Sequence, residues 1–328
     1  MLRTSQIARD HMLTIRTAAL ALATAALVAT VACGDEVKLE EVGDVTPPST
    51  SPVVVGSTDT LVGMGEKPVV EVSLSDAEKA YQEKKYGEAA ELFGVYTDQH
   101  PKNPWGHYML GLSAWKSGDL DRAENAFVRS LELDRKHVKT LLNLTRVHLD
   151  QGRPKHARQR VTAAIALDSS SAEAYRLMGR VRTALNQPNE AIASYRVALS
   201  RDPSDVWSMN NLGLLMIQQG RYEEALGPLA RAVQLDSSVA MFHNNLGIAL
   251  EHTGRYVLAV KAYQDAVRVD VGYTKAKLSL ARVEGRTDDP SVVPVDLAAV
   301  AHVFDREVRG VQVGELVPRP DSVTPPQR

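Results

Sequence analysis

Cysteine is nearly absent from this sequence, and aromatic residues and net charge are scarce. The 328 residues include one cysteine, Cys33, which excludes a disulfide framework or a cysteine-based zinc site within one chain. Aromatic residues make up 5% of the chain, and the formal net charge is -2. Because nucleic-acid-binding proteins usually carry a basic domain or stripe, this balance predicts no nucleic-acid partner.

Catalytic and metal-binding motifs are missing as well. The histidines are scattered along the chain without the His-Glu-x-x-His spacing of a zinc site. Gly63 and Gly65 form a glycine pair that lacks the lysine and serine of a phosphate-binding loop. Glu223 and Glu224 precede a helical alanine series, where acidic residues favour the helix dipole. We therefore predict a protein that is not an enzyme, with no catalytic residue, no metal and no cofactor.

The amino-terminal stretch is predicted to be a targeting segment. Residues 17–32 form a run of small and apolar residues, shorter than the about 20 residues of a membrane span, and arginine precedes the run. We predict a signal peptide over residues 1–32. Met12 is an alternative start, because a compact basic leader begins there.

The end of this run resembles a bacterial lipoprotein signal, because small residues precede the cysteine in Thr30-Val31-Ala32-Cys33-Gly34. Thr30 departs from the pattern, since that family prefers leucine at this place. The resemblance implies cleavage before Cys33 and attachment of acyl chains to it, and more than one chain gives stable anchoring. Gly34, where some members have aspartate, implies the outer membrane facing the periplasm. The alternative is a secreted or soluble periplasmic protein in which Cys33 is a free thiol.

Residues 33–69 are predicted to be a flexible tether that begins with the anchor cysteine. Valine, threonine, serine, proline, glycine and acidic residues dominate this stretch, and no helical apolar period is present. A disordered chain of this length typically reaches about 30 to 35 Å.

A 34-residue repeat runs from Val70 to Tyr273 six times without insertion or deletion. Position 20 of the repeat is alanine in every copy, position 8 is small and position 24 is bulky, a pattern that lets two helices approach closely. Position 15 is mostly glycine or asparagine, which tolerate the left-handed conformation at a helix end. Each repeat is thus predicted to be helix, turn, helix and loop. The repeats span 70–103, 104–137, 138–171, 172–205, 206–239 and 240–273.

This pattern resembles the tetratricopeptide repeat. The resemblance covers residues 70 to about 285 and implies an all-α fold, a right-handed α-solenoid that binds a peptide or a partner protein in a concave groove. Tyr96, Thr145 and Pro228 depart from it, and Pro228 predicts a kink near Glu224. The first-helix part of the resemblance rests on an apolar residue before glycine, in Leu110-Gly111, Met178-Gly179, Leu212-Gly213 and Leu246-Gly247.

After the sixth repeat the pattern stops halfway. Residues 274–285 are predicted to form a capping helix, a seventh first helix without a second one. Residues 286–328 are predicted to be a mostly disordered tail that contains a short helix over 297–308. We expect this helix to dock on the last repeat through its apolar stripe.

Candidate partner-binding residues lie at positions 2, 5, 6, 9, 12 and 13 of the first helices, which line the groove in the resembled family. An asparagine amide can bond both the NH and the CO of an extended peptide, and tryptophan and arginine often dominate interface energy. The alternatives are that the asparagines bond a neighbouring helix, that the tryptophans pack, and that the arginines are solvated or pair with Asp150 and Glu173. The candidates are Trp105, Tyr108, Trp115, Asn143, Arg146, Arg176, Arg180, Trp207, Asn210, Asn211, Asn244 and Asn245.

These expectations together favour a non-enzymatic adaptor of the bacterial cell envelope. Its predicted partner is another protein or an extended peptide, and the membrane is contacted through the lipid anchor only. Pilotins, six-repeat lipoproteins that assist assembly of an envelope complex, are similar in architecture. The alternative is a structural organiser that forms a homo-oligomer through its repeats or links cell-wall machinery.

Overall fold

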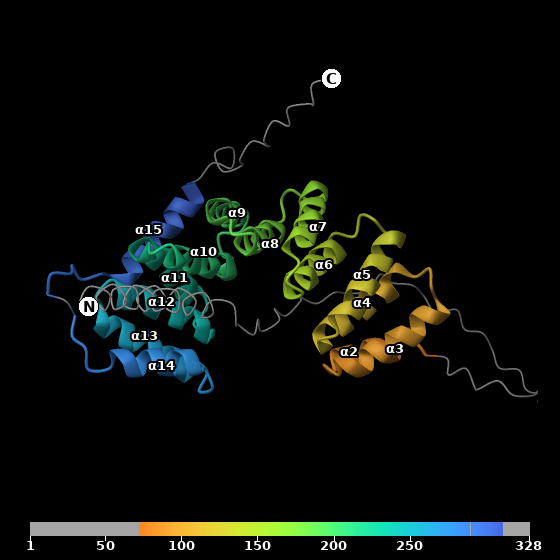
Figure 1. Cartoon of the computed structure of the whole chain (residues 1–328), viewed down its shortest axis with the longest axis horizontal. Coiled ribbons are helices and arrows are strands. Elements are labelled where there is room, and N and C mark those ends of the chain that lie inside the picture. The colour runs from red at the N-terminus through yellow and green to blue at the C-terminus, as the bar shows by residue number, and fades with distance from the viewer. Residues whose placement is uncertain (1–71, 289, 311–328) are drawn as a thin grey trace, which may run out of the picture. The chain divides into compact units, whose positions relative to one another are not determined.

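A computed structural model describes residues 72–288 and 290–310 of the 328-residue chain (Figure 1). This part contains fourteen helices and no strand, so the predicted all-α fold is confirmed. The first helices of the repeats are α2 (Leu74–Gln82), α4 (Pro104–Ser117), α6 (Val138–Asp150), α8 (Ala172–Ala184), α10 (Val206–Gln218) and α12 (Ala240–His252). The second helices are α3 (Tyr86–Gln99), α5 (Leu120–Leu133), α7 (Pro154–Leu167), α9 (Pro188–Arg201), α11 (Tyr222–Leu235) and α13 (Tyr256–Val269). Two more helices follow, α14 (Thr274–Val283) and α15 (Leu297–Gly310).

The turn inside each repeat is made by one residue in the left-handed conformation. The φ angle is 90° at Gly118, and the same repeat position has φ of 57° at Asn186 and 60° at Lys84. Asparagine tolerates this conformation far better than lysine does, so the turn of the first repeat carries the most strain. The next helix then begins at once, and in the second repeat the side chain of Asp119 caps it by accepting from the Arg122 N–H at 3.0 Å.

The two helices of a repeat meet where the small residue at position 8 faces the bulky residue at position 24. A Cβ atom added to Gly179 would lie 2.4 Å from Cε1 of Tyr195, closer than two carbon atoms can approach. The third repeat has Thr145 and Val161 at these two positions, and both are fully buried. In this repeat a larger residue at position 8 is therefore accompanied by a smaller one at position 24. The close helix packing predicted from this pattern is confirmed.

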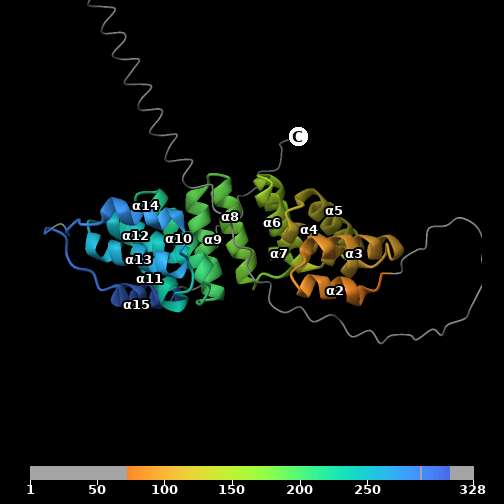
Figure 2. The same cartoon turned by 90° about the horizontal axis from the view of Figure 1, so that it is seen from below.

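Successive repeats stack so that their first helices touch one another, from α4 and α6 through to α12 and α14. Each second helix packs against the first helix of its own repeat and the first helix of the following one. Figure 2 shows the helices in this order along the stack. We call the surface formed by α4, α6, α8, α10 and α12 the first-helix face, and the surface formed by the second helices the second-helix face.

After α14 the chain turns back, and α15 lies against α11 of the fifth repeat and also touches α9 (Figures 1 and 2). The expected docking of this helix on the last repeat is therefore wrong. Gly227 on α11 explains the choice, because an added Cβ atom there would lie 3.2 Å from Cβ of Phe304. Pro228, the next residue, is buried inside α11, and the helix continues through it.

The segment 284–310, which we call the C-terminal strap, is held at three points. Asp288 accepts from the Val257 N–H at 2.7 Å and so caps the first turn of α13. Arg255 donates to the Val293 carbonyl at 3.2 Å, and Arg231 on α11 forms an ion pair with Asp305 on α15 at 3.0 Å. The strap is therefore an integral part of the last repeats.

Several predicted segments lie outside the described residues. These are the signal peptide over 1–32, the tether over 33–69 with Cys33, and the end of the tail over 311–328. Among the helices that the structure describes, none has the length and apolar character to cross a membrane.

Candidate binding surface on the first helices

The aromatic candidates join neighbouring repeats. Trp105 on α4 is partly exposed, and its Nε1 donates to Glu78 of the first repeat at 3.2 Å. Tyr108 is fully buried, and burial raises its pKa to about 12. Trp115 is 6% exposed, and its Nε1 donates to Asp150 of the third repeat at 2.8 Å. Packing between repeats thus occupies Tyr108 and Trp115, while Trp105 offers part of its ring to the surface.

The basic candidates of the third repeat form a connected polar cluster. Arg146, 8% exposed, donates to Oδ1 of Asn143 at 2.8 Å and forms an ion pair with Glu173 of the fourth repeat. Asn143 in turn donates to the hydroxyl of Tyr108 at 3.3 Å. Burial alone would raise the pKa of Glu173, but the Arg146 guanidinium outweighs burial and holds the pKa below its usual value. The positive charge of Arg146 is therefore balanced within the molecule.

The positive charge of Arg176 is likewise balanced by a carboxylate within the molecule. Its guanidinium lies 2.8 Å from Oδ1 of Asp205, a carboxylate that is 6% exposed and also accepts from the Ser208 hydroxyl at 2.6 Å. Arg180, one turn further along α8, is partly exposed. The pairing with Glu173 is present, and Asp150 accepts a hydrogen bond from Trp115. Sequence reasoning missed Asp205, although its place directly before α10 is typical of a helix cap.

Three of the asparagine candidates form a chain of buried amides across the fifth and sixth repeats. Asn244 donates from Nδ2 to Oδ1 of Asn245 at 3.4 Å, and Asn245 donates from Nδ2 to Oδ1 of Asn210 at 2.9 Å. The side chains of Asn210 and Asn244 are 1% and 3% exposed. Within the described residues, Nδ2 of Asn210 and Oδ1 of Asn244 have no hydrogen-bond partner. We call these three residues the amide chain, and it ends in one unpaired donor and one unpaired acceptor.

Asn211 and Trp207 are the candidates of α10 that reach the surface. Both are partly exposed. The ring of Trp207 packs edge-on against Phe242 of the sixth repeat, with 5.1 Å between ring centres. The structure thus separates the predicted residues into a buried layer that joins repeats and a partly exposed layer above it. The exposed layer consists of Trp105, Arg176, Arg180, Trp207 and Asn211.

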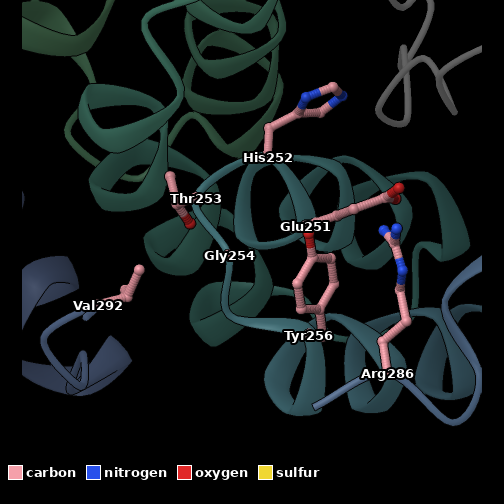
Figure 3. Close-up of a pocket in the computed structure, with 7 residues that line it drawn as sticks. All are labelled: Glu251, His252, Thr253, Gly254, Tyr256, Arg286 and Val292. Atoms are coloured by element: carbon pink, nitrogen blue, oxygen red, sulfur yellow. The ribbon is translucent and has the colours of Figure 1, made fainter. Parts of the chain in front are cut away.

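A hollow of about 530 Å³ lies beside the end of α12, between the turn of the sixth repeat and the strap. Figure 3 shows Glu251, Tyr256 and Arg286 at this hollow, with Val292 of the strap across from them. The guanidinium of Arg286 lies over the ring of Tyr256, 4.7 Å from its centre. Sequence reasoning missed Arg286, because nothing local in the sequence predicts the return of the strap.

The described residues contain no group of three or more histidine, cysteine, aspartate or glutamate side chains that could hold a metal ion. The site therefore offers amides, aromatic rings and balanced ion pairs. These groups suit recognition of a polypeptide segment.

Helix pairs that recur every 34 residues, stacked in register with polar residues on the first helices, define a helical-repeat solenoid. The repeats are tetratricopeptide repeats, as sequence models of that repeat match residues 114–181, 172–205 and 210–270. No curated protein sequence matches the chain significantly.

Two solved structures show the same fold. One is the Cut9–Hcn1 hetero-tetramer of the APC/C, with a TM-score of 0.57 and 19% identity over 64% of this chain. The match spans 42% of the length of that chain. The other is a tetratricopeptide repeat protein from Parabacteroides merdae, with a TM-score of 0.54 and 14% identity over 63% of this chain and 81% of that one.

Proposed function

We propose that this chain is an adaptor of a bacterial cell envelope whose first-helix face binds an extended segment of another protein. A tetratricopeptide repeat solenoid is a protein-interaction scaffold, and this fold supports the proposal. The observation that carries it is the amide chain. Its two ends are an unpaired N–H donor on Asn210 and an unpaired oxygen acceptor on Asn244. A peptide unit can complement both, because its C=O accepts and its N–H donates.

An unpaired polar group in a buried place costs about 1 to 3 kcal/mol, so a partner that reaches both ends gains affinity by satisfying them. Both atoms lie beneath the surface, and the 3.4 Å hydrogen bond from Asn244 to Asn245 is the longer of the two bonds in the amide chain. Rotation of the Asn244 side chain opens this link to an incoming backbone amide. Asn211, on the partly exposed layer, adds a contact at the surface.

The charge balance of the surface indicates what the segment carries. Arg146 and Arg176 are neutralised by Glu173 and Asp205, so the first-helix face does not demand an acidic partner. The partly exposed rings of Trp105 on α4 and Trp207 on α10 offer apolar area for contact. The proposed ligand is an extended segment recognised through its backbone and through apolar side chains.

The test is capture of partner proteins from envelope extracts by the chain with Asn211→Ala and Asn245→Ala. We expect a clear loss of captured partner while circular dichroism stays unchanged. Gln264→Ala, on the exposed side of α13, is the matched control and should capture as much as the natural chain. Equal recovery by the double variant and the control contradicts the proposed site.

We further propose that Cys33 is acylated and anchors the chain at the outer membrane, facing the periplasm. The lipoprotein-like residues 30–34 support this proposal, and an anchored scaffold of this kind would assist assembly of an envelope complex in the manner of a pilotin. A Cys33→Ala chain should lose membrane partitioning in cell fractionation. A variant that still partitions with membranes would show that Cys33 is not the anchor.

The second candidate function is a structural organiser that self-associates. It is favoured by the end of the stack, where no second helix pairs with α14 among the described residues. Leu278 on α14 is 66% exposed, and Val271 in the preceding loop is 70% exposed. Light scattering on residues 70–328 separates the two functions. A monomer favours the adaptor, and a defined oligomer favours the organiser.

A further inference from the structure

The third repeat places an ionisable side chain where most of the other repeats have an apolar one. His148 lies in the last turn of α6, at position 11 of its repeat, and is 2% exposed. In four of the other five repeats the same position holds a buried apolar side chain, namely Ala80, Ala114, Met216 and Leu250. The packing of the third repeat thus depends on an imidazole, a group whose charge changes near neutral pH.

One nitrogen of the His148 ring has a partner and the other has none. Nδ1 lies 3.4 Å from Oε1 of Gln151. The Gln151 amide is held in this orientation because its Nε2 donates to Glu124 at 3.0 Å and to Asp121 at 3.3 Å. An acceptor opposite Nδ1 places the proton of the neutral ring on Nδ1. Nε2 is buried with no hydrogen-bond partner among the described residues, so a second proton would create a buried N–H without an acceptor.

The charges that act on His148 come from α5, from α7 and from α6 itself. Glu124 on α5 lies 3.9 Å from Nδ1 and favours the protonated ring, as does the carboxyl end of α6. Glu124 also pairs with Arg153 at 2.8 Å. On α7, Arg160 and the ring of His156, 5.6 Å away, oppose a new positive charge. Burial is the largest effect, and it holds the pKa of His148 below its ordinary value of 6.5.

The other charged groups of α6 near His148 face a different side. Arg146 and Asp150 each lie two positions from His148, which is about 200° around the helix. Arg146 pairs with Glu173 of α8, and Asp150 accepts from Trp115 of α4 at 2.8 Å. These contacts with α4 and α8 belong to the first-helix face. His148 therefore lies on the side of α6 that meets α5 and α7, inside the joint between the second and third repeats.

We propose that His148 is an acid-sensitive joint between the second and third repeats, closed while its imidazole is neutral and weakened when the imidazole takes up a proton. The ring accepts a proton more readily once α6 moves away from α5 and the ring meets water. Opening of the joint breaks the bond from Trp115 to Asp150 and divides the first-helix face between α4 and α6. This proposal depends neither on acylation of Cys33 nor on the peptide site.

The direction of the pH dependence follows from the lowered pKa. Above the ordinary value of 6.5 the ring is neutral in the closed and the open joint, so the full stability is present. Below 6.5 the open form takes up a proton first, and stability is lost as the pH falls toward the pKa of the closed form.

The test is amide hydrogen exchange of the natural chain at about pH 7.5 and about pH 5.5. Protection factors, which correct for the intrinsic exchange rate, should fall by about three- to tenfold in α6, because exclusion of one proton allows at most about tenfold per pH unit below 6.5. The amides of α10 are the internal reference, since Met216 occupies position 11 there, and they should keep their protection.

His148→Met is the matched variant, because methionine fills the same position in the fifth repeat. It should remove the fall in α6, whereas His156→Gln, on the exposed first turn of α7, should retain most of it. Burial also lowers the pKa of His137, at the amino end of α6, so His137→Gln tests the competing source. A fall that persists in His148→Met and disappears in His137→Gln would overturn the proposal.

The natural chain provides a second measurement that does not depend on folding of any variant. The imidazole resonances of His148, followed by nuclear magnetic resonance, should titrate below 6.5. Titration of His148 at or above 6.5 contradicts the proposal, and so does protection in α6 that is the same at both pH values.

Discussion

Asn245 on α12 donates to Asn210 on α10 across 2.9 Å, and this bond joins the sixth repeat to the fifth through two buried amides. One residue thus serves the packing of the stack and the proposed peptide site at once. Variants of this pair must therefore be tested for stability before their effect on binding is interpreted.

Asn245→Ala should lower the free energy of unfolding by about 1 to 3 kcal/mol, because Oδ1 of Asn210 then loses its buried donor. Urea unfolding followed by circular dichroism measures the change. Asn211→Ala should change stability by less than about 0.5 kcal/mol, since Asn211 is partly exposed and lies outside the amide chain. Equal losses for the two variants would show that the bond to Asn210 does not contribute.

Gly179→Ala should destabilise the fourth repeat by about 1 to 3 kcal/mol, because the new methyl group overlaps the ring of Tyr195. Gly87→Ala on α3 is the matched control, since nothing lies within 4 Å of its added Cβ atom. Alanine there should stabilise the helix by up to about 1 kcal/mol. Thermal unfolding of both variants checks the difference in sign.

Phe304→Ala should release the C-terminal strap from α11. Phe304 is 9% exposed and packs over Gly227. Its replacement by alanine should lower the free energy of docking of the strap by about 2 to 3 kcal/mol, because the apolar area of the ring is no longer buried. Limited proteolysis should then cleave the strap faster, within 284–310. His302→Ala on the exposed side of α15 should leave the cleavage rate unchanged, and similar rates for the two variants would contradict the docking.

Acid should weaken the junction of α12, α13 and α14 through Glu251. Burial alone would raise the pKa of Glu251, but hydrogen bonds from Arg282 and Tyr263 outweigh burial and hold the pKa below the ordinary value of 4.5. The carboxylate therefore contributes stability above about pH 4.5, and the contribution is lost as the pH falls through the lowered pKa.

The matched variant is Glu251→Gln. It should be less stable than the natural chain at pH 7, and the difference should shrink as the pH is lowered below 4.5. Chemical unfolding at a series of pH values gives both curves. A difference that is the same at pH 7 and at pH 3 would exclude a charged role for Glu251.

The helix pairs were predictable because each depends on residues close together in the sequence. Gly118 forms the left-handed turn of its repeat, and Gly179 leaves the space that the ring of Tyr195 occupies. Both effects act within a single repeat. The same local logic placed the candidate residues on the first helices.

The burial and partners of those candidates were less predictable. Whether Asn210 is exposed depends on Asn245, 35 residues away, and on how closely α10 and α12 approach. Docking of α15 was predicted wrongly because its apolar stripe fits any apolar surface. The choice of α11 depends on the space above Gly227 and on the pairing of Asp305 with Arg231, which is 74 residues away.

The return of α15 to the fifth repeat has a consequence for how such a chain can lengthen. A linker of thirteen residues, 284–296, joins α14 to α15, so the docking site must stay a fixed number of helices behind the end of the stack. Duplication of a whole repeat just before α14 would present α15 with a copy of α13 in place of α11, without Gly227 and Arg231. New units can be added near the amino-terminal end without this loss, so growth of the array by gene duplication is permitted at one end and opposed at the other.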